Sequence, residues 1–216
     1  LPDAVTAGCA TDVERVRAEL LYSDDSSALR DVEWDLSGLR FDEPGTYRVT
    51  GRIRTVMHAF PVRPGFADPV VLLREGRYYF IASNDNTDTH GLYACASDTL
   101  EGLFDPDNPM REILPVDVQR GLIQNFWAPE FHEIGGSLYI LFAVSAVENR
   151  VPQPQCQMMR LKPGGDLLDP ASWEDPVPVR RADGSPLGTS GITLDMTCFE
   201  TPRATYLVWS AREHFT

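Results

Sequence analysis

The sequence of 216 residues predicts an all-β protein in which a small β-sandwich precedes an incomplete β-propeller. Two observations favour this fold class. Within residues 1–55, short alternating segments are separated by turn signals about every ten residues, which is typical of a sandwich. From residue 67 onward, one pattern of strand, turn and second strand occurs three times, at intervals of 60 and 67 residues. Regular recurrence of this length indicates a propeller of four-stranded blades.

The three copies of the repeat align on a tyrosine in the second strand, which is Tyr79, Tyr139 or Tyr206. The position eleven residues before each tyrosine is occupied by Asp68, Ala128 and Asp195. We expect strands near 69–74, 77–83, 91–97 and 111–114 in the first copy, near 130–133, 138–145, 155–162 and 176–180 in the second, and near 195–200 and 204–211 in the third. This pattern supplies about two and a half blades, whereas a propeller has at least four. We therefore expect the chain to be a fragment of a longer polypeptide, or one piece of a nicked one.

Composition and charge disfavour several kinds of partner. The net charge of −13 at pH 7 argues against nucleic acid or an anionic membrane surface and suits a neutral ligand. No apolar segment approaches the ~18–20 residues that cross a bilayer, so membrane insertion is not expected. The start of the chain lacks the basic and apolar parts of a secretory signal, a feature that a mature extracellular protein would share.

The four cysteines are widely spaced and include no Cys-x-x-Cys pair, which disfavours a zinc site. Cys95 and Cys156 lie in apolar, strand-like segments, where a free thiol packs as a small hydrophobic group. The spacing of the cysteines neither requires nor excludes disulfides.

The first 55 residues contain several short predicted strands. Residues 18–22 indicate a strand that leads into a polar turn, although 13–21 are also compatible with a short helix. Residues 32–36 and 46–53 alternate apolar and polar side chains with the two-residue period of a strand. The second of these follows the turn Asp-Glu-Pro-Gly at 42–45.

Two of these strands carry a family resemblance. The motif Val-x-Trp-Asp at 32–35, followed by Pro-Gly-Thr-Tyr-Arg-Val-Thr-Gly at 44–51, resembles the bacterial Ig-like domain. This resemblance implies an accessory module at 1–55 that serves as a spacer. A linker over 56–66, with Pro61 and Pro64, would then lead into the propeller segment over 67–216.

Asp68 and Asp195 are the first candidates for chemistry. The first strands of propeller blades line the central channel, so residues at their starts gather around one end of the axis. Two carboxylates in one pocket suit inverting glycoside hydrolysis, in which one group deprotonates water while another protonates the leaving oxygen. A further carboxylate nearby can keep the pKa of the acid high. The spacing is equally compatible with two aspartates that cap turns.

Three motifs together resemble glycoside hydrolase family 43. They are Ala67-Asp68-Pro69 with the following tyrosines, Trp127-Ala128-Pro129-Glu130, and Leu194-Asp195 with Tyr206-Leu207-Val208-Trp209. The most specific is Trp-Ala-Pro-Glu, which falls at its expected place between the other two. The resemblance covers about residues 60–216, which is the N-terminal half of that catalytic domain. It implies a five-bladed β-propeller that acts by inversion on glycans containing arabinose, xylose or galactose.

The resemblance also implies roles for individual residues. Asp68 matches the general base that activates water, and Asp195 matches the aspartate that tunes the pKa of the general acid. The acid of the family is a glutamate in the following blade, and its motif is expected beyond Thr216. No glutamate of this chain is assigned to that role.

Four further residues are candidates for binding substrate. Trp127 resembles the aromatic side chain that stacks on the sugar ring, because sugars present apolar C–H faces; the alternative is a core tryptophan between blades. Glu130 could hydrogen-bond a sugar hydroxyl or satisfy a buried strand end. Phe66 is expected to line the pocket. His90 ends a polar loop and is either a substrate contact or a solvated side chain, while His132 is expected to be a satisfied core histidine.

The residues predict no cofactor and no metal site. The family often holds a calcium ion or a water on the propeller axis, but its usual histidine ligand comes from a later blade. The sequence therefore predicts an oligo- or polysaccharide substrate and a further partner, the C-terminal part of the propeller. The favoured function is a secreted or cell-surface bacterial glycosidase, an exo-α-L-arabinofuranosidase above all. The alternative is a carbohydrate-binding propeller without turnover.

Overall fold

The computed structural model describes residues 5–55, 61–148, 153–188 and 191–212. The chain divides into two compact units, Leu1–Ala59 and Phe60–Thr216. Among the described residues, no helix is long and apolar enough to cross a membrane.

The first unit contains one short helix, α1 (Ala10–Glu14), and two separate hairpins. Strand β1 (Ala18–Leu21) pairs with β2 (Ser27–Arg30), and β3 (Val32–Asp35) pairs with β4 (Thr50–Ile53), both antiparallel. Segment 18–22 is thus confirmed as a strand, with the helix ending before it, and β2 was not anticipated.

The strand expected over 46–53 is confirmed only for β4 and is wrong for 46–49. The Tyr47 hydroxyl donates instead to the carbonyl oxygen of Glu43 at 2.9 Å, so this side chain folds back on its own turn. Across the β3–β4 pair, Gly51 lies opposite Trp34, whose indole N–H donates to the carbonyl oxygen of Val16 at 3.0 Å. Ala18 is the only buried hydrophobic residue in the described part of this unit, so a sandwich core remains a prediction.

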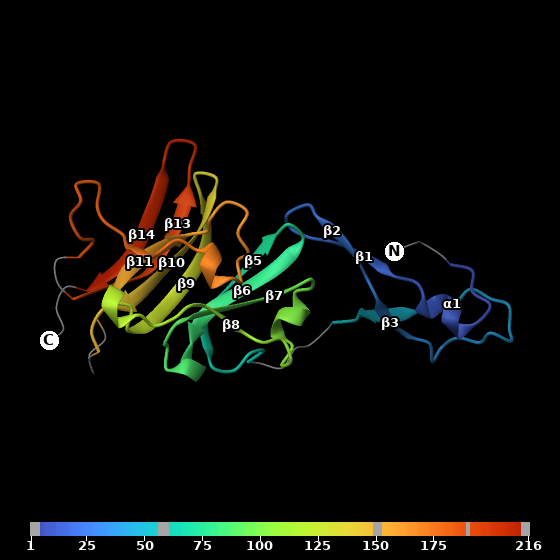
Figure 1. Ribbon diagram of the computed structural model, residues 1–216. Coiled ribbons are helices and arrows are strands. Elements are labelled where there is room, and N and C mark those ends of the chain that lie inside the picture. The colour runs from blue at the N-terminus through green and yellow to red at the C-terminus, as the bar shows by residue number, and fades with distance from the viewer. Residues whose placement is uncertain (1–4, 56–60, 149–152, 189–190, 213–216) are drawn as a thin grey trace. The chain divides into compact units, whose positions relative to one another are not determined.

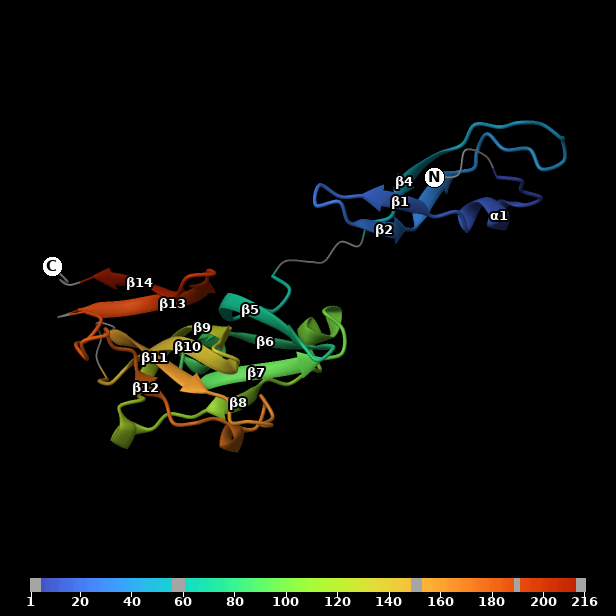
Figure 2. The same ribbon diagram turned by 90° about the horizontal axis from the view of Figure 1, so that it is seen from above.

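The second unit consists of three antiparallel sheets formed in chain order, which are shown in Figures 1 and 2. The first sheet contains β5 (Phe66–Arg74), β6 (Arg77–Asn84), β7 (Leu92–Ser97) and β8 (Arg111–Leu114). The second contains β9 (Gln124–Ile134), β10 (Ser137–Ser145), β11 (Pro154–Arg160) and β12 (Val177–Pro178), and the third contains β13 (Ile192–Glu200) and β14 (Thr205–Arg212). Every strand expected in the three repeats is present.

Short turns and alternating side chains explain these sheets. The β5–β6 turn uses Glu75 and Gly76 at φ 52° and 78°, and the β9–β10 turn uses Gly135 and Gly136 at φ 58° and 77°. Two positive φ values in succession match the twist of a two-residue hairpin, which is why glycine recurs here.

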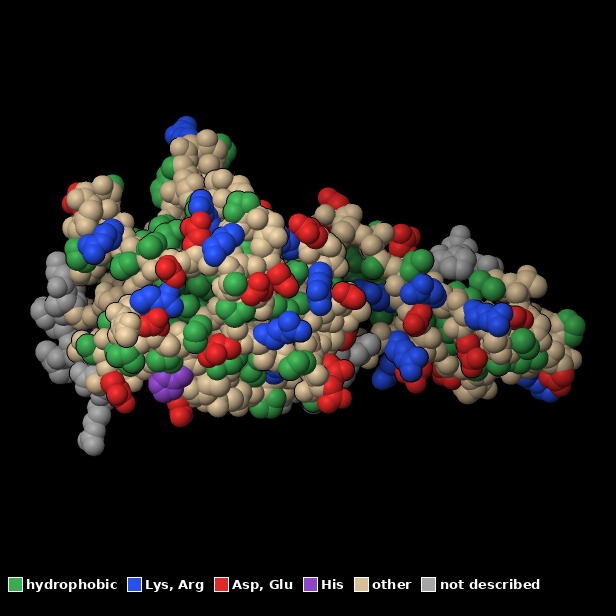
Figure 3. Space-filling view, in the orientation of Figure 1, with side chains coloured by type: hydrophobic (Ala, Val, Ile, Leu, Met, Phe, Trp, Pro, Cys, Tyr) green, Lys and Arg blue, Asp and Glu red, His purple; other side chains and the backbone are tan. Residues whose placement is uncertain are grey.

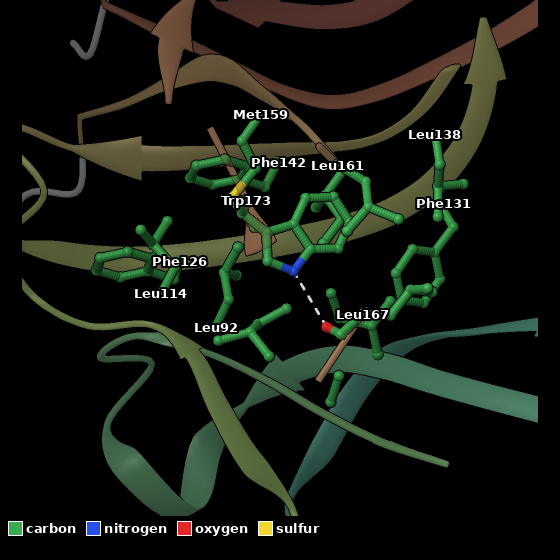
Figure 4. Packing of buried hydrophobic residues seen from close by; sticks show 14 of the residues in the cluster. Leu92, Leu114, Phe126, Phe131, Leu138, Phe142, Met159, Leu161, Leu167 and Trp173 are labelled. Atoms are coloured by element: carbon green, nitrogen blue, oxygen red, sulfur yellow. Dashed lines mark hydrogen bonds between the residues drawn. The ribbon is translucent and has the colours of Figure 1, made fainter. Parts of the chain in front are cut away.

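The main core lies between the first and second sheets, and Figure 4 shows its packing. Ile140, Phe142 and Val144 face this cluster from β10, whereas Leu141 faces a second cluster between the second and third sheets. This alternation follows from the two-residue period of a strand. The buried indole of Trp173 donates to the carbonyl oxygen of Leu167 at 3.1 Å within the main core (Figure 4). The sheets therefore stack face to face, as neighbouring propeller blades do.

On the surface seen in Figure 3, acidic and basic side chains are interspersed. Pairs such as Arg74 with Glu133, at 2.9 Å, join the first and second sheets at the surface. Exposed pairs of this kind stabilise a fold by only about 0–1 kcal/mol. The buried apolar clusters therefore hold the sheets together.

Candidate active site

The three equivalent positions of the repeat share an unusual backbone conformation. Asp68, Ala128 and Asp195 have φ values of 52°, 44° and 52°, in the left-handed region that non-glycine residues rarely adopt. In all three hairpins the pairing register shifts at this point. Each first strand thus carries a β-bulge at the same place, and a bulge re-aims the side chain that it carries. The alignment of the repeat on its tyrosines is confirmed in three dimensions.

Ser83 of β6 connects Asp68 to the second sheet. Its hydroxyl donates to Oδ2 of Asp68 at 2.8 Å and accepts the backbone N–H of Ala128, also at 2.8 Å. Ser83 and Ala128 are 2% and 7% exposed, so their end of this connection is buried, whereas Asp68 is exposed. The carboxylate of the first repeat is therefore fixed against the bulge of the second.

Asp195 lies in a region of negative charge. Partial burial raises the pKa of its carboxyl, and the nearby carboxylates Asp68 and Glu130 raise it further. A hydrogen bond from Ser210 acts in the opposite direction and lowers this pKa. Three carboxylates, one from each sheet, therefore interact electrostatically at this end of the strands.

Glu130 is paired with His132 two residues along β9. The Nε2 atom of His132 lies 2.6 Å from Oε2 of Glu130, and their side chains are 17% and 30% exposed. His132 is thus half-buried and satisfied by a carboxylate, in line with the expected satisfied histidine. One carboxylate oxygen of Glu130 is occupied by this contact, and the residue still influences Asp195.

Trp127 and its neighbour Phe126 differ in their surroundings. Phe126 is fully buried and lies parallel to Phe142 with ring centroids 6.4 Å apart. Trp127 is half-buried and lies opposite Ala143 on β10. Phe126 therefore supplies the aromatic bulk of the core, and the Trp127 ring retains accessible surface.

Phe66 and His90 make their contacts elsewhere. Phe66 packs edge-on against Phe80 at 5.8 Å and under the guanidinium of Arg63 at 5.3 Å, on the face of the first sheet opposite the main core. His90 is exposed, and its Nδ1 lies 3.1 Å from the carbonyl oxygen of Thr87 in its own loop. Substrate contact by either residue stays a prediction.

Ser83 and Ser210 were not predicted as site residues, although the spacing of the repeat contains a signal for them. The position four residues after each tyrosine is Ser83, Ala143 and Ser210. The structure pairs these residues with Ala67, Trp127 and Leu194, each of which directly precedes the bulge. A serine therefore occurs in the two copies that carry an aspartate and is replaced by alanine in the copy that carries Ala128.

The cysteines of the described chain are free thiols, and Cys95 and Cys156 are buried as expected. Burial raises the pKa of Cys156 to about 11, and the Asp195 carboxylate adds to this rise. Within the described ranges, no group of three or more His, Cys, Asp or Glu side chains is arranged to hold a metal ion.

Antiparallel sheets that stack in chain order are typical of propeller blades, and comparison with known proteins names the family. The model for glycosyl hydrolases family 43 matches residues 59–215, and the chain belongs to this family.

Two curated relatives and one solved structure illustrate the similarity. The extracellular exo-α-(1→5)-L-arabinofuranosidase of Streptomyces chartreusis is 29% identical over 169 residues, which are 73% of this chain and 47% of the relative. The α-L-arabinofuranosidase B of Pyricularia oryzae is 29% identical over 147 residues, 67% of this chain and 27% of the relative. The crystal structure of the α-L-arabinofuranosidase from Lactobacillus brevis is 27% identical with a TM-score of 0.57, over 69% of this chain and 45% of that one. The chain thus spans about half the length of its relatives, or less.

Proposed function

We propose that these three sheets belong to an inverting exo-α-L-arabinofuranosidase that acts on arabinose-containing glycans, with xylose- and galactose-containing glycans as related substrates. The observation that carries this proposal is the placement of Asp68 and Asp195 on equivalent bulges, close enough for one charge to raise the pKa of the other. The arabinofuranosidase names of both curated relatives support the choice of sugar.

In the proposed mechanism, Asp68 is the general base that removes a proton from the attacking water. Its exposed side chain can reach water, while Ser83 holds Oδ2 in place. Asp195 keeps negative charge beside the general acid and so raises the pKa of that acid. The acid itself is proposed to be a glutamate supplied from outside these three sheets.

Four residues are proposed to bind the substrate. The accessible face of Trp127 provides a platform for the apolar face of a sugar ring. Glu130 is proposed to accept a hydrogen bond from a sugar hydroxyl, a role that its carboxylate chemistry and its contact with His132 support. Phe66 and His90 are also proposed to contact the substrate.

The remaining proposals concern the surrounding protein. The propeller is proposed to have five blades, and residues 1–55 to form an Ig-like spacer. The extracellular location of the Streptomyces relative supports secretion of this protein.

The test is hydrolysis by the full-length enzyme of p-nitrophenyl α-L-arabinofuranoside, compared with the xyloside and the galactofuranoside. We expect the arabinofuranoside to be cleaved with the highest kcat/KM. Release of only another sugar would reject the arabinose assignment. Binding of glycans without any hydrolysis would favour a carbohydrate-binding propeller instead.

A further inference from the structure

Two positions of the repeat vary together: Asp68 occurs with Ser83, Ala128 with Ala143, and Asp195 with Ser210. The fold does not require this pattern, because the copy with two alanines forms the same bulged hairpin. Each serine is one strand away from the aspartate of its own copy, opposite the residue before the bulge. The copy without a carboxylate has Ala143 at this position, which is 1% exposed and packed in the interior. In this repeat, a serine hydroxyl therefore occurs only in the two copies whose bulge carries an aspartate that can accept its hydrogen bond.

We propose that Ser83 and Ser210 are positioning residues that hold the two aspartates in their working orientations. The inference rests on the proposed function and adds to it two groups that act through the carboxylates. A left-handed bulge sets the direction of the Cα–Cβ bond, but the carboxylate can still rotate about its side-chain bonds. A hydroxyl donor at 2.8 Å from Oδ2 of Asp68 restricts that rotation.

Ser83 has a second function in this scheme, because its oxygen also accepts the backbone N–H of Ala128. That N–H comes from the bulge of the neighbouring sheet, so the orientation of Asp68 is tied to the packing of the first sheet on the second. Ser210 acts on Asp195 from β14, and the other groups that face this carboxylate are Asp68 from β5, Glu130 from β9 and the Cys156 thiol from β11. His132 faces it only through Glu130.

The first measurement is a carbon-13 NMR titration of Asp195 in the full-length protein, since it does not depend on activity. Ser210→Ala should raise the pKa of Asp195, because a donor to its charged form is lost, and Ser210→Thr should restore it. Ser83→Ala should change the pKa of Asp195, because the released Asp68 carboxylate rotates and so changes the charge that acts on Asp195.

Ser145→Ala is a matched control for Ser83→Ala. The Ser145 hydroxyl is also buried, donates to Oδ1 of Asn125 at 2.8 Å and accepts the backbone N–H of Gln153 at 3.2 Å, but its acceptor is not a carboxylate. Both variants should lower the Tm, and only Ser83→Ala should move the titration of Asp195. An unchanged titration in both serine variants, or an equal change in Ser145→Ala, would overturn the inference.

The second measurement is hydrolysis of the p-nitrophenyl arabinofuranoside by the full-length enzyme. Ser83→Ala should reduce kcat about 10- to 100-fold with little change in KM, which is the loss expected when a reacting group is misplaced. Ser145→Ala should keep the kcat of the wild type, and an equal loss of kcat in both variants would mean that Ser83 is merely structural. If the wild type hydrolyses no aryl glycoside, the proposed function fails, and the Asp195 titration alone decides the positioning role.

Discussion

Among single residues, the site depends on one backbone conformation with positive φ and on the carboxylates of the residues that adopt it. Asp68 and Asp195 adopt positive φ values that aspartate tolerates better than most residues, because its short polar side chain hydrogen-bonds locally. Ala128 adopts the same conformation without that advantage. Strain at an alanine persists only where the surroundings enforce it, and the buried hydrogen bond to Ser83 is one such constraint.

Replacing Asp68 by asparagine should abolish hydrolysis while the fold is kept. An amide cannot accept the proton from water, so we expect a loss of about 10²–10⁴-fold in kcat/KM. Asp88→Asn is the matched control, because Asp88 is exposed and has the same φ of 52° outside the proposed site. The comparison is made by steady-state kinetics with circular dichroism of both variants. Retained activity in Asp68→Asn would rule out its role as the base.

The raised pKa of Asp195 predicts a defined pH dependence of stability. The folded protein binds the proton of the Asp195 carboxyl more tightly than the unfolded chain does. The protonated carboxyl therefore contributes stability at pH values below its ordinary pKa of 3.8. That contribution is lost as the pH rises through the raised pKa. Relative to Asp195→Asn, the wild type should therefore lose free energy of unfolding across this window, as measured by urea denaturation at a series of pH values. A wild type that gains stability there relative to the variant would contradict the assignment.

At the scale of the element, cross-strand pairs determine which segments form sheets. In the first unit, Gly51 lies opposite Trp34, and a Cβ atom there would lie 2.5 Å from Cγ1 of Val32 and 2.7 Å from the Trp34 ring. The indole ring therefore covers a glycine that no larger residue can replace without moving it.

Gly51→Ala should destabilise the β3–β4 hairpin by about 1–3 kcal/mol, the usual cost of overpacking. Gly38→Ala is the control, since nothing lies within 4 Å of its Cβ position and its φ is not positive. Hydrogen exchange of the β4 amides measures the difference. Equal protection in the two variants would mean that the Trp34 ring moves aside at no cost.

In the molecule as a whole, the buried apolar clusters formed by the described residues all belong to the second unit. Phe126 belongs to the largest of them and is fully buried. Phe126→Ala should cost the second unit about 3–5 kcal/mol, because a large cavity replaces the ring.

If the two units are separate folding units, the amide NMR signals of residues 5–55 should not change in Phe126→Ala. Phe41→Ala, at a side chain that is 44% exposed in the first unit, should leave the Tm of the second unit unaffected. Loss of the first unit's signals together with those of the second would show that the units fold cooperatively.

The strands of the three sheets and the equivalence of Asp68, Ala128 and Asp195 could be predicted from the sequence, because alternation and repeat spacing are local properties of the chain. The sequence also contains the matching positions Ser83 and Ser210. Serine hydroxyls serve many purposes in proteins, however, and no local pattern identifies these two as site residues. Segment 46–49 showed the alternation of a strand and is irregular, because Tyr47 bonds to its own turn. Two contacts could not be predicted in this way: Ser83 joins Asp68 to Ala128, and Phe66 packs on the opposite face of its sheet. These contacts depend on how separate sheets stack, and that is set by the whole core rather than by any one segment.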